Sequence, residues 1–316
     1  MSIQKKLNLK GKKVALIQGG IGPEKEISWK TSQCVEKVLK TLPCSYFVAE
    51  ADSTLFQQLK NEKPDLAFLA VHGIYGEDGT VQALCELLQI PYTGSGILAS
   101  ALCMDKLFFK NLLLKNKIAT PDFKAVHSSQ KTSSIKNYPV IVKASHGGST
   151  LGTYIVQNPE ELPDALKKAK NIGRYVFIEE YIPQGTEIAV SYLNGRILTP
   201  VEIVPKSGFY DYNHKYNIGQ TDYILPPRLD PLTVEKMKVI SEKVISLTNV
   251  RGYARLDFIV KKNTPWLLEV NTLPGLTETS LLPKSAEKEG LSFSQVIEMI
   301  LSVATLDYPS AINKKS

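Results

Sequence analysis

Two apolar strands near the C-terminal end carry polar residues on one face, and this pattern constrains the fold more than any other in the chain. The first strand reads Arg255-Leu-Asp257-Phe-Ile-Val, and the second ends in Leu-Leu-Glu269-Val-Asn271. Residues two apart on a strand share a face, so each strand presents two polar side chains together. A hairpin turn centred on Asn263 predicts Asp257 opposite Glu269 and Arg255 opposite Asn271, with Cβ atoms about 4.5–5.5 Å apart.

Two carboxylates at that distance repel each other unless a positive charge compensates them. Asp257, Glu269 and Asn271 offer hard oxygen atoms, which suit a Mg²⁺ ion that is also held by substrate phosphates. A cross-strand salt-bridge network built on Arg255 would satisfy the same carboxylates without a metal. The spacing alone leaves both interpretations open.

The N-terminal third alternates short apolar strands with helices. We expect strands over 13–18, 45–49 and 65–71, and helices over 24–42, 55–60 and 80–88. This alternation predicts a parallel, doubly wound sheet, in which functional loops follow the carboxyl ends of the strands.

The rest of the chain does not continue this regular alternation of short strands and helices. Gly94-Ser95-Gly96 opens a helix that we expect to run without a break over 97–115. Further strands are expected at 140–144 and 175–182, a hairpin at Asn194-Gly195, and helices over 231–247 and after Pro283. The segment 206–223 is polar, rich in tyrosine and without periodicity, which is typical of a functional loop.

Composition bounds the class of protein. The 316 residues, 43% hydrophobic and 22% charged, suffice for two or three packed units. The net charge of +7 is mild and the densest lysines lie near the two ends, so solvated tails explain them better than a nucleic-acid site. Four cysteines without CxxC spacing indicate reduced thiols. No charged-then-apolar leader and no apolar run of roughly 18 residues occur, so we expect a soluble, cytoplasmic protein with no membrane or nucleic-acid partner.

Two lysines and a glycine-rich loop indicate a phosphate site. Lys106 lies on the helix expected over 97–115, and Lys143 ends the apolar strand Val-Ile-Val-Lys. The following segment, 144–152, reads Ala-Ser-His-Gly-Gly-Ser-Thr-Leu-Gly and supplies backbone N–H and hydroxyl donors for phosphates. It is neither a P-loop nor a G-x-G-x-x-G motif. The alternatives are a lysine that snorkels from a buried strand and a plain turn.

The next acidic stretch suits a nucleoside. Glu179-Glu180-Tyr181-Ile182, with Glu187 a few residues on, mixes carboxylates with apolar groups, as an adenine edge and ribose hydroxyls require. Solvated surface glutamates are the alternative interpretation.

Together these residues resemble the D-alanine–D-alanine ligase family of the ATP-grasp fold, over roughly residues 14–301. The stretches that carry the resemblance are His72-Gly-Ile-Tyr-Gly-Glu-Asp-Gly79, Tyr92-Thr-Gly-Ser-Gly96, Met104-Asp-Lys106, Arg255-Leu-Asp257 and Leu268-Glu-Val-Asn-Thr-Leu-Pro-Gly275. Each is weak alone, and their order and spacing are specific.

The resemblance implies an α/β (α+β) architecture of three domains: an N-terminal doubly wound parallel sheet (1–104), a central small α+β lid (105–184), and a C-terminal antiparallel-sheet domain with a mobile loop at 206–222 (185–316). It implies ATP-dependent ligation of two D-alanines through a D-alanyl phosphate, for peptidoglycan synthesis, with release of ADP and phosphate. ATP, D-alanine, two Mg²⁺ (or Mn²⁺) ions and a homodimer are the implied partners.

The resemblance also implies roles for individual residues. Those implied to bind ATP are Lys106, Lys143 and Lys215 at the phosphates, Glu180, Tyr181 and Ile182 at the adenine, and Glu187 at the ribose. Asp257, Glu269 and Asn271 would hold the metal ions. The residues implied to act on the substrates are Glu24 at the first ammonium, His72 near the first carboxylate, Arg255 and the Gly275 N–H as an oxyanion hole, Ser280 and Leu281 at the second carboxylate, and Ser149 and Tyr216 as links from Glu24 to the loop.

The chain departs from the family pattern at three places. The segment Ile21-Gly22-Pro23 after Gly20 is unusual, although Glu24 is retained. Gly147 stands where the family usually has a glutamate, and Thr279 where a histidine often precedes the serine. The changes at Gly147 and Thr279 affect the nucleotide loop and the second-substrate pocket.

A relative that uses D-lactate or D-serine is one alternative, although Tyr216 favours D-alanine. A dinucleotide-dependent oxidoreductase is a second alternative, but the glycines after the first strand of this chain lack the spacing that such an enzyme requires. A non-catalytic nucleotide-binding protein is a third, but it would not need the metal carboxylates.

Overall fold

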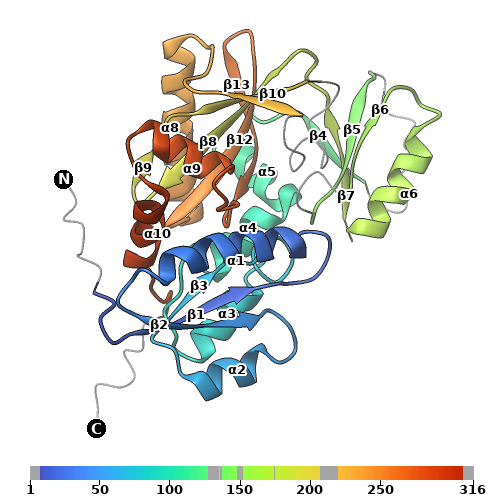
Figure 1. Ribbon diagram of the computed structural model, residues 1–316. Coiled ribbons are helices and arrows are strands. Elements are labelled where there is room, and N and C mark those ends of the chain that lie inside the picture. Colours follow the sequence, from blue (N-terminus) through green and yellow to red (C-terminus); the bar gives the residue numbers. More distant parts are fainter. Residues whose placement is uncertain are drawn as a thin grey trace.

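The computed structural model describes residues 8–126, 135, 137–147, 152–173, 175–206 and 220–308. Its strands form three sheets, which are arranged around a common centre (Figure 1). No helix in this described part of the chain is both long and apolar enough to span a bilayer.

The N-terminal sheet is parallel, as the alternation of strands and helices predicts, with strand order β2-β1-β3. Its strands are β1 (Lys13–Gln18), β2 (Ser45–Glu50) and β3 (Leu66–Leu69), and its helices are α1 (Lys25–Leu39), α2 (Leu55–Glu62) and α3 (Thr80–Leu87). The four inner residues of β1 and all four of β3 are buried, as expected for parallel strands that are covered on both faces. Helix α1 lies between this sheet and the rest of the molecule (Figure 1).

The prediction of one continuous helix over 97–115 is wrong, because the helix is interrupted at Asp105. Two helices result, α4 (Ile97–Met104) and α5 (Lys106–Lys115). Asp105 is extended (φ −84°, ψ 96°), and its carboxylate accepts the N–H groups of Leu107 (3.0 Å) and Phe108 (3.1 Å). The aspartate is therefore an N-cap in the middle of a continuous apolar pattern. The break makes Lys106 the first residue of α5.

The central sheet is antiparallel, with strand order β4-β7-β5-β6. Its elements are β4 (Phe123–Val126), β5 (Val140–Ala144), β6 (Thr153–Val156), α6 (Leu162–Ile172) and β7 (Val176–Glu180). Strands β5 and β7 were predicted, whereas the four-residue strands β4 and β6 and the helix α6 were not. Helix α6 packs its leucines and alanines on one face of this sheet.

The C-terminal sheet is also antiparallel, with strand order β11-β10-β8-β12-β13 and β9 beside β8. Its strands are β8 (Thr186–Leu193), β9 (Arg196–Ile197), β10 (Val201–Pro205), β11 (Thr221–Ile224), β12 (Tyr253–Lys261) and β13 (Thr264–Asn271), and its helices are α8 (Pro231–Thr248), α9 (Leu281–Lys288) and α10 (Phe293–Ser302). The Asn194-Gly195 turn joins β8 to β9, as predicted.

The β12–β13 hairpin has the predicted register at its polar end, although its turn is not centred on Asn263. Lys262 and Asn263 both have positive φ (48° and 59°) and form a two-residue turn that pairs Lys261 with Thr264. A register shift next to Asp257 adds one residue to the second strand and restores the pairs Asp257–Glu269 and Arg255–Asn271. The bulge therefore aligns the four polar residues.

Candidate active site

Two adjoining pockets contain every predicted site residue that the structure describes. The first lies between the central and C-terminal sheets and is lined by Lys106, Lys143, Glu180, Tyr181, Ile182, Glu187 and Asp257 among others. The second lies between α1 and the segment after β13 and is lined by Glu24, His72, Asn271, Gly275 and Ser280 among others. Arg255, Glu269 and Leu281 line both pockets. Ser149, Lys215 and Tyr216 lie outside the described residues.

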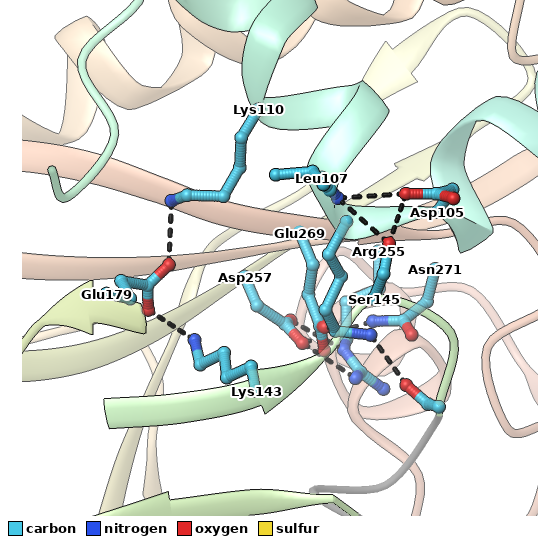
Figure 2. A network of polar contacts seen from close by, with 12 residues as sticks. Asp105, Leu107, Lys110, Lys143, Ser145, Glu179, Arg255, Asp257, Glu269 and Asn271 are labelled. Atoms are coloured by element: carbon cyan, nitrogen blue, oxygen red, sulfur yellow. Dashed lines mark hydrogen bonds and ion pairs between the residues drawn. The ribbon is translucent and has the colours of Figure 1, made fainter. Parts of the chain in front are cut away.

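Arg255 and Asp257 form a bidentate ion pair on the face of β12. The Nε and Nη2 atoms of Arg255 donate to the two carboxylate oxygens of Asp257 at 2.7 and 2.8 Å, and Asn271 Nδ2 donates to Asp257 Oδ2 at 3.1 Å (Figure 2). This salt bridge lies within β12, and the Asn271 amide links it to β13, so the cross-strand network that we considered as the alternative to a metal site is present only in part. It accounts for Asp257, and Glu269 has a different partner.

Lys106 compensates the negative charge of Glu269. Its Nζ lies 3.1 Å from Glu269 Oε2 and donates to the carbonyl oxygen of Gly147 at 2.6 Å. Burial opposes the charge on Lys106, but Glu269 and the neighbouring carboxylates outweigh burial and raise the pKa of the lysine. The N-cap Asp105 also accepts a hydrogen bond from Ser145 Oγ, which ties the start of α5 to the loop after β5. The helix break thus aims Lys106 at the point where the two pockets meet.

The donor set of the hairpin suits a hard divalent cation that is completed by phosphates. Two carboxylates face each other across β12 and β13, and Asn271 adds an amide oxygen beside them. Among the described residues no group of three or more His, Cys, Asp or Glu side chains is gathered in a way that could hold a metal. A cation here would therefore take its remaining ligands from substrate and water, which is the usual arrangement for Mg²⁺.

A buried carboxylate lies between two lysines on the wall of the first pocket. Glu179 on β7 is 1% exposed; its Oε1 lies 2.7 Å from Lys110 Nζ, and its Oε2 accepts from Lys143 Nζ (Figure 2). Glu180 lines the same pocket, but its side chain is exposed at the end of β7. We predicted Lys143 and Glu180, included Glu179 in the stretch expected at the nucleoside with a solvated position as the alternative, and assigned no role to Lys110; Glu179 is buried and not solvated. The sequence offered one signal for this buried pair, a charged residue within each of two apolar runs: Phe-Phe-Lys110-Asn-Leu and Phe-Ile-Glu179.

His72 is a buried, neutral side chain that lines the second pocket. Its Nδ1 lies 2.8 Å from the carbonyl oxygen of Leu273, which only accepts, so Nδ1 carries the proton. Nε2 then accepts from the hydroxyl of Thr31 at 2.8 Å. Burial lowers the pKa of His72 to about 4, so the ring is uncharged near neutral pH. His72 thus links the end of β3 to α1 and to the segment after β13.

Two acidic residues lie close together in the same pocket. Glu24, 9% exposed, precedes α1, and a Cβ atom on Gly73 would lie 2.1 Å from Glu24 Oε2. Glu77 accepts the N–H of Gly73 at 3.0 Å, and burial together with the charge of Glu24 raises the pKa of Glu77 to about 8. A pKa of about 8 leaves Glu77 mostly protonated at neutral pH, so Glu24 is the carboxylate of this pair that suits an ammonium group.

The start of α9 forms the far wall of the second pocket. Ser280 is the N-cap residue of α9; its hydroxyl oxygen accepts the N–H of Thr277 at 3.0 Å and lies 2.8 Å from Thr277 Oγ1. Gly275 lies against it, since a Cβ atom there would be 3.1 Å from Ser280 Oγ. The first N–H groups of a helix lack intrahelical partners and attract anions. This wall suits a carboxylate.

Comparison with known proteins agrees with the geometry. The family models described as D-ala D-ala ligase C-terminus and N-terminus match residues 111–302 and 48–95. The D-alanine–D-alanine ligase of Syntrophotalea carbinolica is 42% identical over 301 residues, covering 94% of this chain and 98% of its own. That of Aquifex aeolicus is 40% identical over 294 residues, covering 92% and 100%.

A solved structure agrees as well. The D-alanine–D-alanine ligase of Bacillus anthracis complexed with ATP superposes with a TM-score of 0.81 at 32% identity, covering 92% of this chain and 96% of its own. The fold, the two joined pockets and the extent of these matches lead to one conclusion: the chain belongs to the D-alanine–D-alanine ligase family.

Proposed function

We propose that this chain joins two D-alanine molecules to give D-alanyl-D-alanine for peptidoglycan synthesis, with conversion of ATP to ADP and phosphate. As a member of the D-alanine–D-alanine ligase family it is an ATP-dependent ligase. The observation that carries the proposal is the junction of the two pockets at Arg255 and Glu269. A phosphoryl donor bound in the first pocket and a carboxylate bound in the second would meet there.

The first pocket is assigned to ATP. Lys106 and Lys143 would bind the phosphates, and Lys215 would join them from outside the described residues. The adenine would lie against Tyr181 and Ile182, with Glu180 at its edge and the ribose hydroxyls near Glu187. Two Mg²⁺ (or Mn²⁺) ions bound by Asp257, Glu269 and Asn271 would offset the negative charge of the transferring phosphoryl group.

The first chemical step activates a carboxylate. The ammonium of the first D-alanine would bind at Glu24. Its carboxylate would lie near His72 and point toward the junction of the two pockets. A carboxylate oxygen attacks the terminal phosphorus of ATP, the bond to the bridging oxygen breaks, and ADP leaves. The product is an acyl phosphate, whose carbonyl carbon is a far better electrophile than that of the original carboxylate.

The second step forms the peptide bond. The second D-alanine would bind through its carboxylate at Ser280 and Leu281, where α9 begins. After losing a proton, its amine attacks the acyl carbon. Arg255 and the N–H of Gly275 would stabilise the oxyanion. Collapse of the intermediate expels phosphate and leaves the dipeptide.

We also propose several features that accompany this activity. The boundaries after residues 104 and 184 would separate three domains. The segment 206–222 would close over the pockets through Tyr216 and Ser149, because an acyl phosphate must be kept from water. The enzyme would act in the cytoplasm as a homodimer.

The test is product analysis with purified protein, ATP, Mg²⁺ and D-alanine. We expect ADP, phosphate and D-alanyl-D-alanine in equal amounts. D-lactate and D-serine offered as acceptors alongside D-alanine test the departure at Thr279. Phosphate release without dipeptide, or faster coupling of D-lactate at neutral pH, would contradict the choice of substrate.

A further inference from the structure

We propose that Lys110 is a positioning residue for nucleotide binding: as the fixed counter-ion of Glu179, it allows Lys143 to move from Glu179 to a nucleotide phosphate. The inference rests on the proposed assignment of Lys143 to the phosphates. It starts from the chain of charges in Figure 2, in which one buried carboxylate is shared by two ammonium groups.

The two lysines have different freedom. Lys110 is 1% exposed, donates a hydrogen bond to Thr120 Oγ1 and lies over the ring of Phe123, with Nζ 5.1 Å from its centroid. The wall of the first pocket includes Lys143 and Glu179, whereas Lys110 lies behind it. Lys143 is 13% exposed and stands on the pocket side of β5. Of these two lysines, Lys143 already faces the pocket and can contact a ligand there, whereas Lys110 would first have to leave its buried position.

Lys110, Glu179 and Lys143 together carry one net positive charge. Lys110 and Glu179 neutralise each other, so Lys143 supplies a net positive charge at the pocket wall. Burial alone would raise the pKa of Glu179, but Lys143 and Lys110 outweigh burial and lower it, which keeps the carboxylate ionised. Burial and the charge of Lys143 lower the pKa of Lys110, against the opposing effect of Glu179. The carboxylate and the two lysines therefore depend on each other.

The role of Lys110 follows from the state after Lys143 has moved. With Lys110 in place, Glu179 keeps a partner at 2.7 Å. Without Lys110, transfer of Lys143 to a phosphate would leave a fully buried carboxylate with no counter-ion, which is a strongly unfavourable state. Lys143 would then stay on Glu179, and the nucleotide would lose a phosphate contact.

The experiment compares ligands with and without phosphates. We would measure the Kd of ATP and of adenosine for the full-length protein and its Lys110→Met variant. The ratio of adenosine Kd to ATP Kd is expected to fall at least about tenfold in the variant, with adenosine affinity almost unchanged. Lys115→Met, an exposed lysine at the end of the same helix, is the matched control and should keep the wild-type ratio.

Removing both buried charges should reverse the defect. In Lys110→Met/Glu179→Gln, nothing holds Lys143, so the ratio should return toward the wild-type value. This double variant has no unpaired buried carboxylate and keeps the test valid where Lys110→Met fails to fold. A ratio as low in the double variant as in Lys110→Met would overturn the inference, as would equal weakening of ATP and adenosine by Lys110→Met.

Lys143→Ala separates this inference from the proposed function. We expect that variant to lower the ratio and to make a further Lys110→Met change ineffective. An unchanged ratio in Lys143→Ala would refute the phosphate role of Lys143 and the inference with it. A lowered ratio in Lys143→Ala beside a normal ratio in Lys110→Met would refute the inference alone.

Discussion

Replacing Asp257 with asparagine separates the two interpretations of the C-terminal hairpin. Asparagine keeps the shape of the side chain and one acceptor oxygen, so part of the contact with Arg255 survives. The side chains of Asp257 and Arg255 are 18% and 19% exposed, and solvent weakens their attraction. We expect the substitution to lower the free energy of unfolding by about 1 kcal/mol, which corresponds to a fall in Tm of about 2–4 °C in a protein of this size.

The effect on catalysis should be much larger if Asp257 binds the metal. Charge stabilisation by a bound cation contributes several kcal/mol to the transition state. Loss of about 3–4 kcal/mol corresponds to a fall in kcat/KM of roughly 10²–10³-fold. The assay is the initial rate of ADP release with D-alanine, measured over a range of Mg²⁺ concentrations. In Asp257→Asn, the Mg²⁺ concentration that gives half-maximal activity should be higher than in the wild-type protein, and kcat/KM should be lower.

Glu202→Gln provides the matched control. Glu202 is 4% exposed and accepts from Arg228, at 2.6 Å from Nη2 and 2.8 Å from the backbone N–H, and it is absent from the walls of both pockets. The same chemical change at a carboxylate that is also paired with arginine should therefore cost at least as much stability and leave kcat/KM unchanged. If Asp257→Asn reduces kcat/KM no more than Glu202→Gln does, the hairpin is a structural salt bridge and the metal assignment is wrong.

Three further substitutions test other parts of the structure. Gly73→Ala should raise the KM for D-alanine about tenfold, since a new methyl group would displace the carboxylate of Glu24 and the left-handed φ of 68° disfavours alanine; an unchanged KM would contradict the role of Glu24. Asp307→Ala should lower the free energy of unfolding by about 1–2 kcal/mol without changing kcat, because Asp307 accepts the N–H of Ile97 at the start of α4 (3.0 Å); a change in kcat would argue against a purely structural role. The pKa of His72 is about 4 in the folded protein and 6.5 as the ordinary value, so the unfolded chain binds more protons between these values and stability falls as pH falls through that window. From pH 7 to pH 5 the wild-type protein should lose about 2 kcal/mol more than His72→Gln, and equal losses by denaturant titration would exclude a buried neutral ring.

The hairpin shows why residue spacing can predict a pairing for an incomplete reason. A turn centred on Asn263 pairs Asp257 with Glu269, and so does the actual turn, which is one residue shorter on its second side and is followed by a bulge. The alternation of apolar and polar residues determines which face each strand buries, so the polar pairs were predictable. The bulge depends on local backbone geometry that the alternation does not encode.

The break at Asp105 and the charges around Glu179 mark the limit of local patterns. The apolar residues continue across Asp105, and one helix ends and the next begins where the Asp105 side chain caps α5 and the Lys106 N–H donates to the carbonyl oxygen of Ser145. Likewise, Lys110 and Glu179 are 69 positions apart in sequence, and their pairing depends on how α5, whose apolar residues pack with the C-terminal sheet, is placed beside β7. Such contacts are tertiary, so periodicity and propensity cannot predict them.

The assigned cations that the structure describes share one property that bears on how the ligase would bind its substrates. Lys106 is paired with Glu269, Lys143 with Glu179, and Arg255 with Asp257. Binding a nucleotide, metal ions and an acyl group would therefore exchange existing ion pairs for new ones, and each new contact would be opposed by the loss of an old one. Affinity would then depend on what compensates the released carboxylates. The metal ions would do so for Asp257 and Glu269, and Lys110 would do so for Glu179, which lies away from the hairpin on the wall of the nucleotide pocket.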